Sequence, residues 1–423
     1  MPKLYQPPTG GRDLLPLDVV QKRWIEDRLE QVFQRWGYHR IITSTVETMD
    51  TLMAGGAIER VEVIELQLGQ AGQQRLGLRP ELTASIARAA VTRLASVTYP
   101  QRLYYNANVF RRLAQGSQGN QQEYHQAGIE LLGASGLMAD AETILLAADC
   151  LNALNISDTC LVIGEAALTY SLLSVFPEEI RETVRRHIAA LDLVALDEMP
   201  LSDELRDRVS DLMSLRGDPK TVLTKLNSIS LTDAQKEIVD RLSSLVDLLH
   251  LEQSHGTPIP PIVFDLSLIR PFDYYTGIVF EIASGASKQT LGQGGRYDEL
   301  LAVYDTRDTQ AAKGFPGIGF VLNIDQLQQE LSSSAQLPSE TPPSDWLIVP
   351  EDESAAAAAL AYAQKARRSE GAGQSAGQNM VRVEMCLDLS QSQDEVRAIA
   401  RKRNISRIAW ISNKGLPDIE VVN

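Results

Sequence analysis

The feature that most constrains the fold is a pair of strand-like segments joined by a long polar connection. Residues 101–111 and 123–132 contain the aromatic and β-branched residues that favour strands, and the eleven residues between them are mostly polar. Such a pair predicts an antiparallel hairpin, and the period of two in a strand divides the second segment into two faces. One face holds Tyr124, Gln126, Gly128 and Glu130, and the other holds His125, Ala127, Ile129 and Leu131. We therefore expect a sheet with one core face and one polar face that has a glycine gap.

The segments around this hairpin indicate helices before it and strands after a helical stretch. Apolar residues recur at helical spacing from Val20 to Trp36, and a second helix is expected from about Glu81 to Ala95, after Arg79-Pro80. Residues 171–253 predict successive short helices without a strand. Strands return after Pro261, and the run LGQGGRYDELL (291–301) predicts a glycine-rich turn.

A Ser- and Pro-rich stretch marks a domain boundary near the C-terminal end of the chain. Residues 332–344 (SSSAQLPSETPPS) have linker composition, and residues 345–423 alternate strand and helix as a small α/β domain. The expected fold class is α+β: a domain over residues 1–331 with an antiparallel sheet flanked by helices and a helical insert at about 171–253, followed by this small domain.

Charge and cysteine usage exclude several classes of function. Lys and Arg number 40 and Asp and Glu 55, so the net charge of -15 disfavours broad nucleic-acid binding. The three cysteines (Cys150, Cys160 and Cys386) form no CxxC pair, which favours buried free thiols over a disulfide framework or a metal site. No stretch of 18 uncharged apolar residues occurs, so we expect a cytoplasmic protein without a membrane partner.

Four segments carry polar groups that an ordinary core does not need. They are RPELTA (79–84), QAGIE (126–130), LIRPFDYYTG (268–277) and GGRYDEL (294–300). With YNANVFRR (105–112), their order and spacing resemble the class II aminoacyl-tRNA synthetases, specifically the histidyl-tRNA synthetase family. The resemblance covers nearly the whole chain, from PPTGGRDLLP (7–16) to the tail, which resembles a shortened anticodon-binding domain. It implies a six-stranded antiparallel sheet that carries a histidine site.

The resemblance implies which residues would hold histidine. Glu81 and Thr83 match positions that hold the α-amino group, where a carboxylate suits an ammonium ion. Gln126 and Glu130 match positions that meet the α-amino group and the imidazole, and Gly128 between them leaves room for the ligand.

Further matches complete this implied site. Arg270 matches the family's catalytic arginine near the carboxylate, and Tyr274 and Tyr275 match tyrosines that close over the ring. Gly294 and Gly295 match backbone that approaches the ligand closely. Arg111 matches the motif 2 arginine, so residual phosphate contact stays open.

Each match also has a purely structural interpretation when it is taken alone. Glu81 could complement the dipole of the helix that begins there. Gln126 and Glu130 could lie on an exposed sheet face, DYYTG could be an aromatic strand with a turn, and GGRYD could be a turn before a helix. The occurrence of all these segments in the family order favours one shared site.

The departures from the family concern the nucleotide. Leu113 stands where the family has a glutamate that contacts adenine, and residues 113–122 contain no basic residue. Gln326 stands at the position of the arginine that binds the γ-phosphate, and a neutral amide does not replace a guanidinium. Ser44 replaces the proline of the dimer segment, although a class II dimer is still expected.

With these departures, the chain is similar to the synthetase paralogues that serve as regulatory subunits of ATP phosphoribosyltransferase. That resemblance implies no catalytic residue, no metal and no cofactor. It implies assembly with short-form catalytic subunits into a hetero-oligomer, expected to be an octamer, and feedback inhibition of histidine biosynthesis by bound histidine, with tRNA not expected as a partner. Two alternatives stay open: an active histidyl-tRNA synthetase, and a histidine-binding pseudoenzyme with another partner.

Overall fold

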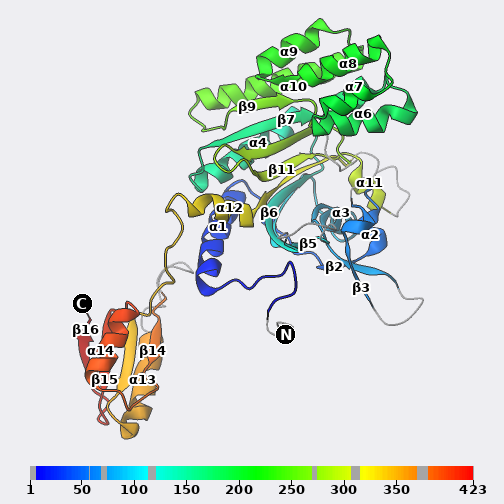
Figure 1. Ribbon diagram of the computed structural model, residues 1–423. Coiled ribbons are helices and arrows are strands. Elements are labelled where there is room, and N and C mark those ends of the chain that lie inside the picture. The colour runs from blue at the N-terminus through cyan, green and yellow to red at the C-terminus, as the bar shows by residue number, and fades with distance from the viewer. Residues whose placement is uncertain are drawn as a thin grey trace. The chain divides into compact units, whose positions relative to one another are not determined.

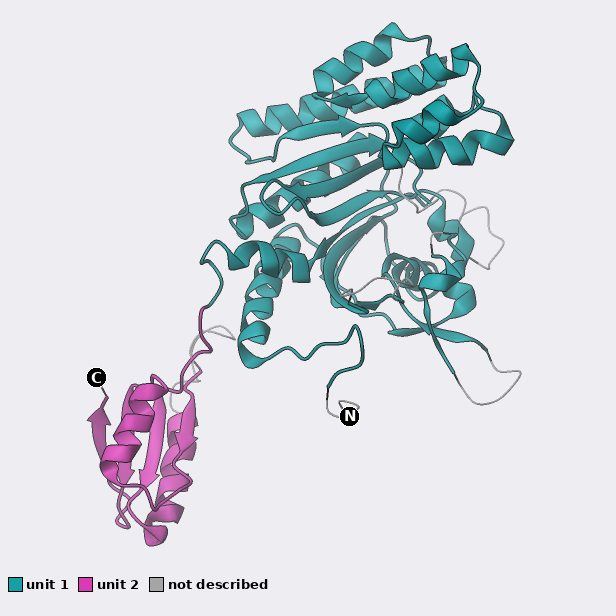
Figure 2. Cartoon of the chain, in the orientation of Figure 1, with its two compact units in different colours: residues 1–338 teal, residues 339–423 magenta. Residues whose placement is uncertain are grey.

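The computed structural model describes residues 6–56, 58–67, 74–112, 121–268, 274–305, 315–368 and 380–422. The chain forms two compact units, residues 1–338 and 339–423 (Figure 2). Their boundary falls inside the predicted linker. The last two residues of unit 1, Leu337 and Pro338, nevertheless make contacts with the rest of that unit. Leu337 is buried against the core of unit 1, and the carbonyl of Pro338 accepts a hydrogen bond from Gln21.

Unit 1 is built on a nine-stranded sheet (Figure 1). In order across the sheet, the strands are β1 (His39–Arg40), β5 (Gln101–Phe110), β6 (Glu123–Leu132), β12 (Gly317–Asn323), β11 (Thr290–Arg296), β10 (Ile278–Ser284), β7 (Thr159–Glu165), β9 (Ile262–Asp265) and β8 (Arg216–Gly217). The six strands from β5 to β7 are antiparallel throughout, so the predicted six-stranded core is confirmed. At one end of this core, β1 pairs in parallel with β5. At the other end, β9 pairs in parallel with β7, and β8 pairs antiparallel with β9, so the sheet is longer than expected at both ends.

The predicted hairpin is the pair β5 and β6. Its register runs from Gln101 opposite Leu132 to Phe110 opposite Glu123. Ala127, Ile129 and Leu131 are buried in the main core, as the alternation predicted. Most of the polar connection, residues 113–120, lies outside the described residues.

Helices cover both faces of the sheet. The core on one face is formed with α1 (Pro16–Arg35), α4 (Leu137–Ala153), α10 (Asp233–Ser254) and α12 (Ile324–Ser332). The core on the other face is formed with α3 (Thr83–Thr92) and α11 (Leu300–Tyr304), and α2 (Met49–Met53) packs against α3. In Figure 1, β6 separates α1 from α3, so the polar face of the hairpin strand lies on the α3 side.

The predicted helical insert contains one short strand that the sequence did not indicate. Its helices are α5 (Ala166–Leu173), α6 (Glu178–Ala190), α7 (Leu193–Glu198), α8 (Asp203–Ser214), α9 (Pro219–Ser228) and α10. The two-residue strand β8 pairs with β9, and Arg216 forms an ion pair with Asp265 of that strand. Two residues are too few to produce a periodicity, so pairing with a distant strand decides this local structure.

The predicted glycine-rich turn is wrong, because residues 290–296 form the central strand β11. A Cβ atom at Gly294 would lie 2.5 Å from the carbonyl oxygen of Gly319, and one at Gly295 would lie 2.6 Å from Cε1 of Tyr275. These glycines permit close approach within the sheet, and neither has a positive φ that a turn would require.

Two smaller sheets complete the structure. One holds β2 (Val46–Thr48), β4 (Leu76–Leu78) and β3 (Ile64–Leu66), with the short helix η1 (Arg60–Glu62) before β3. Unit 2 has the order β14 (Val383–Met385), β13 (Trp346–Pro350), β15 (Arg407–Ile411) and β16 (Pro417–Val421), with the short helix η2 (Glu353–Ala355) and with α13 (Ala356–Arg368) and α14 (Gln393–Lys402) on opposite faces. This confirms the small α/β fold. In the described ranges no helix is both long and apolar enough to span a membrane.

The cysteines are free thiols, but they are not all buried. Cys150 is buried in the main core, whereas Cys160 and Cys386 are partly exposed. The expectation of buried thiols therefore holds for one of the three. Within the described ranges, no group of three or more His, Cys, Asp or Glu side chains is arranged to hold a metal ion.

Candidate functional site

A small buried cavity lies between the sheet and the start of α3. Its polar and aromatic lining side chains are Glu81, Thr83, Tyr105, Arg111, Gln126, Glu130, Tyr274, Tyr275, Gln293, Tyr297 and Phe320. The free volume is about 30 Å³, which is room for a water molecule or two and too small for an amino acid. The structure therefore brings the predicted residues together around a space that they nearly fill.

Gly294 and Gly319 line this cavity, and together with Gly128 we call them the glycine floor. Gly128 of β6, Gly319 of β12 and Gly294 of β11 each lie so close to a neighbouring strand that a Cβ atom would overlap its backbone. At Gly319 the added atom would also overlap the carboxylate of Glu130. Backbone without side chains therefore creates the space in which the carboxylate lies.

Glu130 is the buried carboxyl group at the centre of the site. It is 2% exposed, and it accepts hydrogen bonds from Thr83 Oγ1 at 2.8 Å and from the hydroxyl of Tyr297. Burial raises its pKa to about 8, against the lowering effect of these two hydrogen bonds, and the nearby Glu81 adds to the rise. An interpretation of Glu130 as part of an exposed sheet face is therefore wrong.

Glu81 combines the two roles that the sequence suggested. Its carboxylate accepts from the backbone N–H groups of Thr83 and Ala84, so it caps the first turn of α3. It also lines the cavity, where burial raises its pKa while these hydrogen bonds and the charge of Arg111 lower it. A carboxylate that already caps a helix is held in a fixed orientation toward a ligand.

Three of the tyrosines in the lining pack against one another. The ring of Tyr274 lies 4.7 Å from that of Tyr275 and 5.8 Å from that of Tyr297, centroid to centroid, with an edge-on angle of 82° to the latter. Such edge-on contacts are typical of packed aromatic clusters. Arg270, the remaining predicted ligand residue, lies outside the described residues.

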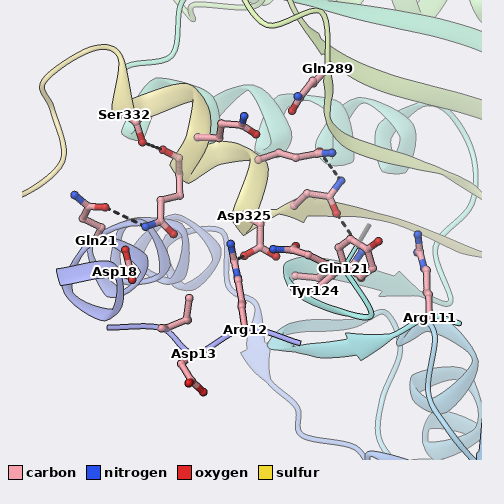
Figure 3. A pocket seen from close by; sticks show the side chains of 16 residues that line it. Arg12, Asp13, Asp18, Gln21, Arg111, Gln121, Tyr124, Gln289, Asp325 and Ser332 are labelled. Atoms are coloured by element: carbon pink, nitrogen blue, oxygen red, sulfur yellow. Dashed lines mark hydrogen bonds and ion pairs between the residues drawn. The ribbon is translucent and has the colours of Figure 1, made fainter. Parts of the chain in front are cut away.

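A larger open cleft lies next to the cavity, between the segment before α1, the start of β6 and α12 (Figure 3). Its volume is about 960 Å³. Carboxamides dominate its lining: Gln21, Gln121, Gln126, Gln289, Asn323, Gln326, Gln328 and Gln329. Gln126 and Arg111 line both spaces, so they stand at the junction between the cleft and the cavity.

The described lining of the cleft contains both cations and carboxylates. Among its described lining residues the cations are Arg12 and Arg111. Arg12 forms an ion pair with Asp325, and in Figure 3 the two side chains point toward one another. The Nε of Arg111 donates to the carbonyl of Pro80 at 3.2 Å. With Asp13 and Asp18 also in the lining, negative charges outnumber positive ones.

The sequence reasoning missed several residues of the cavity. Tyr297 lies in the segment GGRYDEL, whose local pattern indicates no role for its hydroxyl, although this group contacts Glu130 directly. Tyr105, in YNANVFRR, also lines the cavity, and its local pattern does not indicate this position. The sequence does contain an indication for Gly319. A predicted strand with a glycine on either side of Ile318 indicates that another part of the backbone approaches closely there.

Comparison with known proteins agrees with this fold. Residues 10–327 match the family model described as histidyl-tRNA synthetase. ATP phosphoribosyltransferase regulatory subunits from Nostoc sp. and Picosynechococcus sp. are 54% and 49% identical to the chain, over 99% of its length and 100% of theirs.

Solved structures show the same relationship. One described as an ATP phosphoribosyltransferase regulatory subunit/histidyl-tRNA synthetase from Bacillus halodurans is 27% identical, with a TM-score of 0.77 over 97% of this chain and 99% of that one. The histidyl-tRNA synthetase of Nostoc sp. is 19% identical, with a TM-score of 0.74 over 99% and 97%, and shows the shared fold. The chain belongs to the histidyl-tRNA synthetase family, and within that class it is a member of the ATP phosphoribosyltransferase regulatory subunits.

Proposed function

We propose that this chain is a non-catalytic regulatory subunit that binds histidine in the buried cavity and conveys feedback inhibition to short-form catalytic subunits of ATP phosphoribosyltransferase. The two kinds of subunit assemble into a hetero-octamer that carries out the first step of histidine biosynthesis, with this chain paired as a class II dimer. Family membership supports the regulatory role. The single observation that carries the proposal is the contrast between an amino-acid cavity with buried carboxylates and an adjacent cleft in which negative charges outnumber positive ones.

The cavity offers complementary chemistry for each polar end of histidine. Glu81 and the amide oxygen of Gln126 suit the α-ammonium group, since charged hydrogen bonds are about twice as strong as neutral ones. Glu130 and the tyrosine rings suit the imidazole, which is both a hydrogen-bonding and an aromatic group. A cationic ligand favours the ionised form of Glu130 and so opposes the effect of burial, which raises the pKa of this carboxyl group.

Histidine binding also requires the cavity to open. About 30 Å³ of free volume cannot hold histidine, and Tyr274 and Tyr275 are partly exposed walls that can move outward at the least cost. A ligand that binds one conformation more tightly than another shifts the population toward it. If the catalytic subunits respond to that conformation, a coupling of about 1 to 3 kcal/mol gives useful inhibition.

Nucleotide binding, which a synthetase reaction would require, has little support in the cleft. Adenylate formation depends on positioning and neutralising phosphates. Gln326 supplies a neutral amide at the family's arginine position, and the described cleft has an excess of carboxylates. Absence of synthetase activity is therefore part of the proposal.

The decisive experiment measures phosphoribosyltransferase activity of a short-form catalytic subunit with and without this chain, across a histidine titration. We expect activity to rise when the chain is added and to fall as histidine is added. Failure of the chain to associate or to change activity would refute the regulatory role. Histidine-dependent pyrophosphate exchange at the rate of an ordinary synthetase would instead establish the rival function.

A further inference from the structure

Three carboxamides form a hydrogen-bonded chain that runs from the cavity into the cleft. Gln126 of β6 and Asn323 of β12 are cross-strand partners, and Gln126 Nε2 donates to Asn323 Oδ1 at 3.1 Å. Asn323 Nδ2 then donates to Gln326 Oε1 at 3.0 Å. Of these three carboxamides, Gln126 is the one that lines the cavity in the described structure.

Asn323 makes these amide hydrogen bonds and no helix-capping hydrogen bond. Asn323 is the N-cap residue of α12, and asparagine is among the best residues at that position because its side chain accepts from the first free N–H groups. Here the side chain makes no capping hydrogen bond. Its two polar atoms are both engaged in the amide chain instead.

The orientation of each amide in such a chain fixes the next, because a carboxamide has an acceptor end and a donor end. In the observed arrangement the NH₂ group of Gln126 is used on Asn323, so its oxygen is the atom available to a ligand in the cavity. At the other end, the NH₂ group of Gln326 is available in the cleft. Reversal of the chain would present an NH₂ group to the cavity and an oxygen to the cleft.

We propose that Asn323 and Gln326 are positioning residues for the amino-acid ligand, which hold the Gln126 amide with its oxygen toward the α-ammonium group. This inference rests on the proposed binding of histidine in the cavity. It has a consequence for the cleft: a group there that accepts a hydrogen bond from Gln326 stabilises the orientation that binds an ammonium ion. A group that donates to Gln326 favours the reversed chain and weakens binding. The cleft and the cavity are therefore coupled through amide orientation.

The test uses a pair of charged substitutions at one position of the chain. In Gln326→Glu the carboxylate can only accept, which keeps Asn323 donating to it and the oxygen of Gln126 toward the cavity. In Gln326→Lys the ammonium can only donate, which turns Asn323 and presents the NH₂ group of Gln126 to the ligand. Histidine affinity is measured by calorimetry for both variants, and the ratio of the two affinities is the readout.

The same pair at Gln329 controls for the direct effect of charge. Gln329 lies on the same helix and lines the same cleft, and its side chain has no hydrogen bond within the described structure to Gln126, Asn323 or Gln326. We expect the Glu-to-Lys affinity ratio at 326 to exceed the ratio at 329 by about tenfold, the range of one charged hydrogen bond. For 3-(imidazol-4-yl)propionate, the two affinity ratios should be equal. This analogue lacks the α-ammonium group, so its affinity does not depend on the orientation of the Gln126 amide.

Each outcome decides the inference. A tenfold excess for histidine that is absent for the des-amino analogue supports it. Equal ratios at 326 and 329, in variants whose thermal unfolding shows that they are folded, overturn it while the proposed histidine site stands. Failure of the unmodified chain to bind histidine overturns the proposed function and this inference together.

Discussion

The buried cavity and the open cleft are neighbours that share Gln126 and Arg111, yet they are built in different ways. The cavity rests on the glycines of central strands and holds carboxyl groups whose pKa values burial raises. The cleft is lined from the segment before α1, from α1, from the start of β6 and from α12, and neutral amides are half of its described lining residues. The difference teaches that a binding floor made by a sheet is fixed by packing, whereas a wall made by helix side chains can change its chemistry without disturbing the fold.

Removal of the buried carboxylate should have the largest effect on the cavity. We expect Glu130→Ala to weaken histidine binding by about 1.5 to 3 kcal/mol, or roughly 10- to 150-fold, because a charged hydrogen-bond partner is lost from a site with 2% exposure. Calorimetry measures this loss directly. The matched control is Gln289→Ala in the cleft, which should leave histidine affinity within about twofold, since its side chain lies outside the described cavity lining. An equal affinity for the Glu130 variant would place the ligand elsewhere.

Restoration of a cation in the cleft tests the other side of the comparison. Gln326→Arg should raise the affinity for ATP by about tenfold, because a guanidinium binds phosphate bidentately and an amide does not. If the amide chain operates, the same variant should bind histidine less tightly, since arginine can only donate to Asn323. Unchanged binding of ATP, measured by calorimetry, would show that something other than this missing charge limits nucleotide binding.

Taken per pH unit, the smallest expected effect is a pH dependence of stability. The pKa of Glu130 is raised to about 8 by burial, so the folded chain keeps a proton there that the unfolded chain loses near its ordinary value of 4.5. The free energy of unfolding should therefore fall as the pH rises between these values, at most about 1.4 kcal/mol per pH unit from this group. Glu130→Gln should flatten the slope across that window, as denaturant unfolding at several pH values would reveal.

A second carboxyl group provides the control for that measurement. Burial raises the pKa of Glu165 to about 7, so Glu165→Gln should flatten the slope up to about pH 7 and leave the decline between pH 7 and 8. If both variants retain the full slope of the unmodified chain, neither carboxyl is protonated in the folded state at neutral pH.

The parts of the fold that sequence reasoning predicted are those with a regular local pattern. The alternation in residues 123–132 predicted both the hairpin and the buried face with Ile129 and Leu131. The alternation of strands and helices after Asp345 likewise predicted the fold of unit 2. In the site, the order of the motifs predicted that Glu81, Gln126 and Glu130 lie together, and all three line one cavity.

The parts that failed depend on contacts between distant segments. Residues 290–296 contain three glycines and look locally like a turn, but partners on β10 and β12 hold them in a strand. Leu337 lies in a stretch of linker composition, and only the core of unit 1 reveals that it is docked. The hydroxyl of Tyr297 has its role because β11 and β6 are separated by one strand, which no local pattern contains.

The glycine floor has a practical consequence for anyone who wishes to redesign this protein for a different amino acid. Any larger residue at Gly128, Gly294 or Gly319 collides with main-chain atoms of an adjacent strand, so the floor offers no freedom to an engineer. Selectivity would have to be altered at Tyr105, Tyr297 or the two tyrosines at 274 and 275, where a trimmed ring creates space. Libraries of variants aimed at these four aromatic positions should yield folded chains with new preferences far more often than libraries aimed at the strands beneath them.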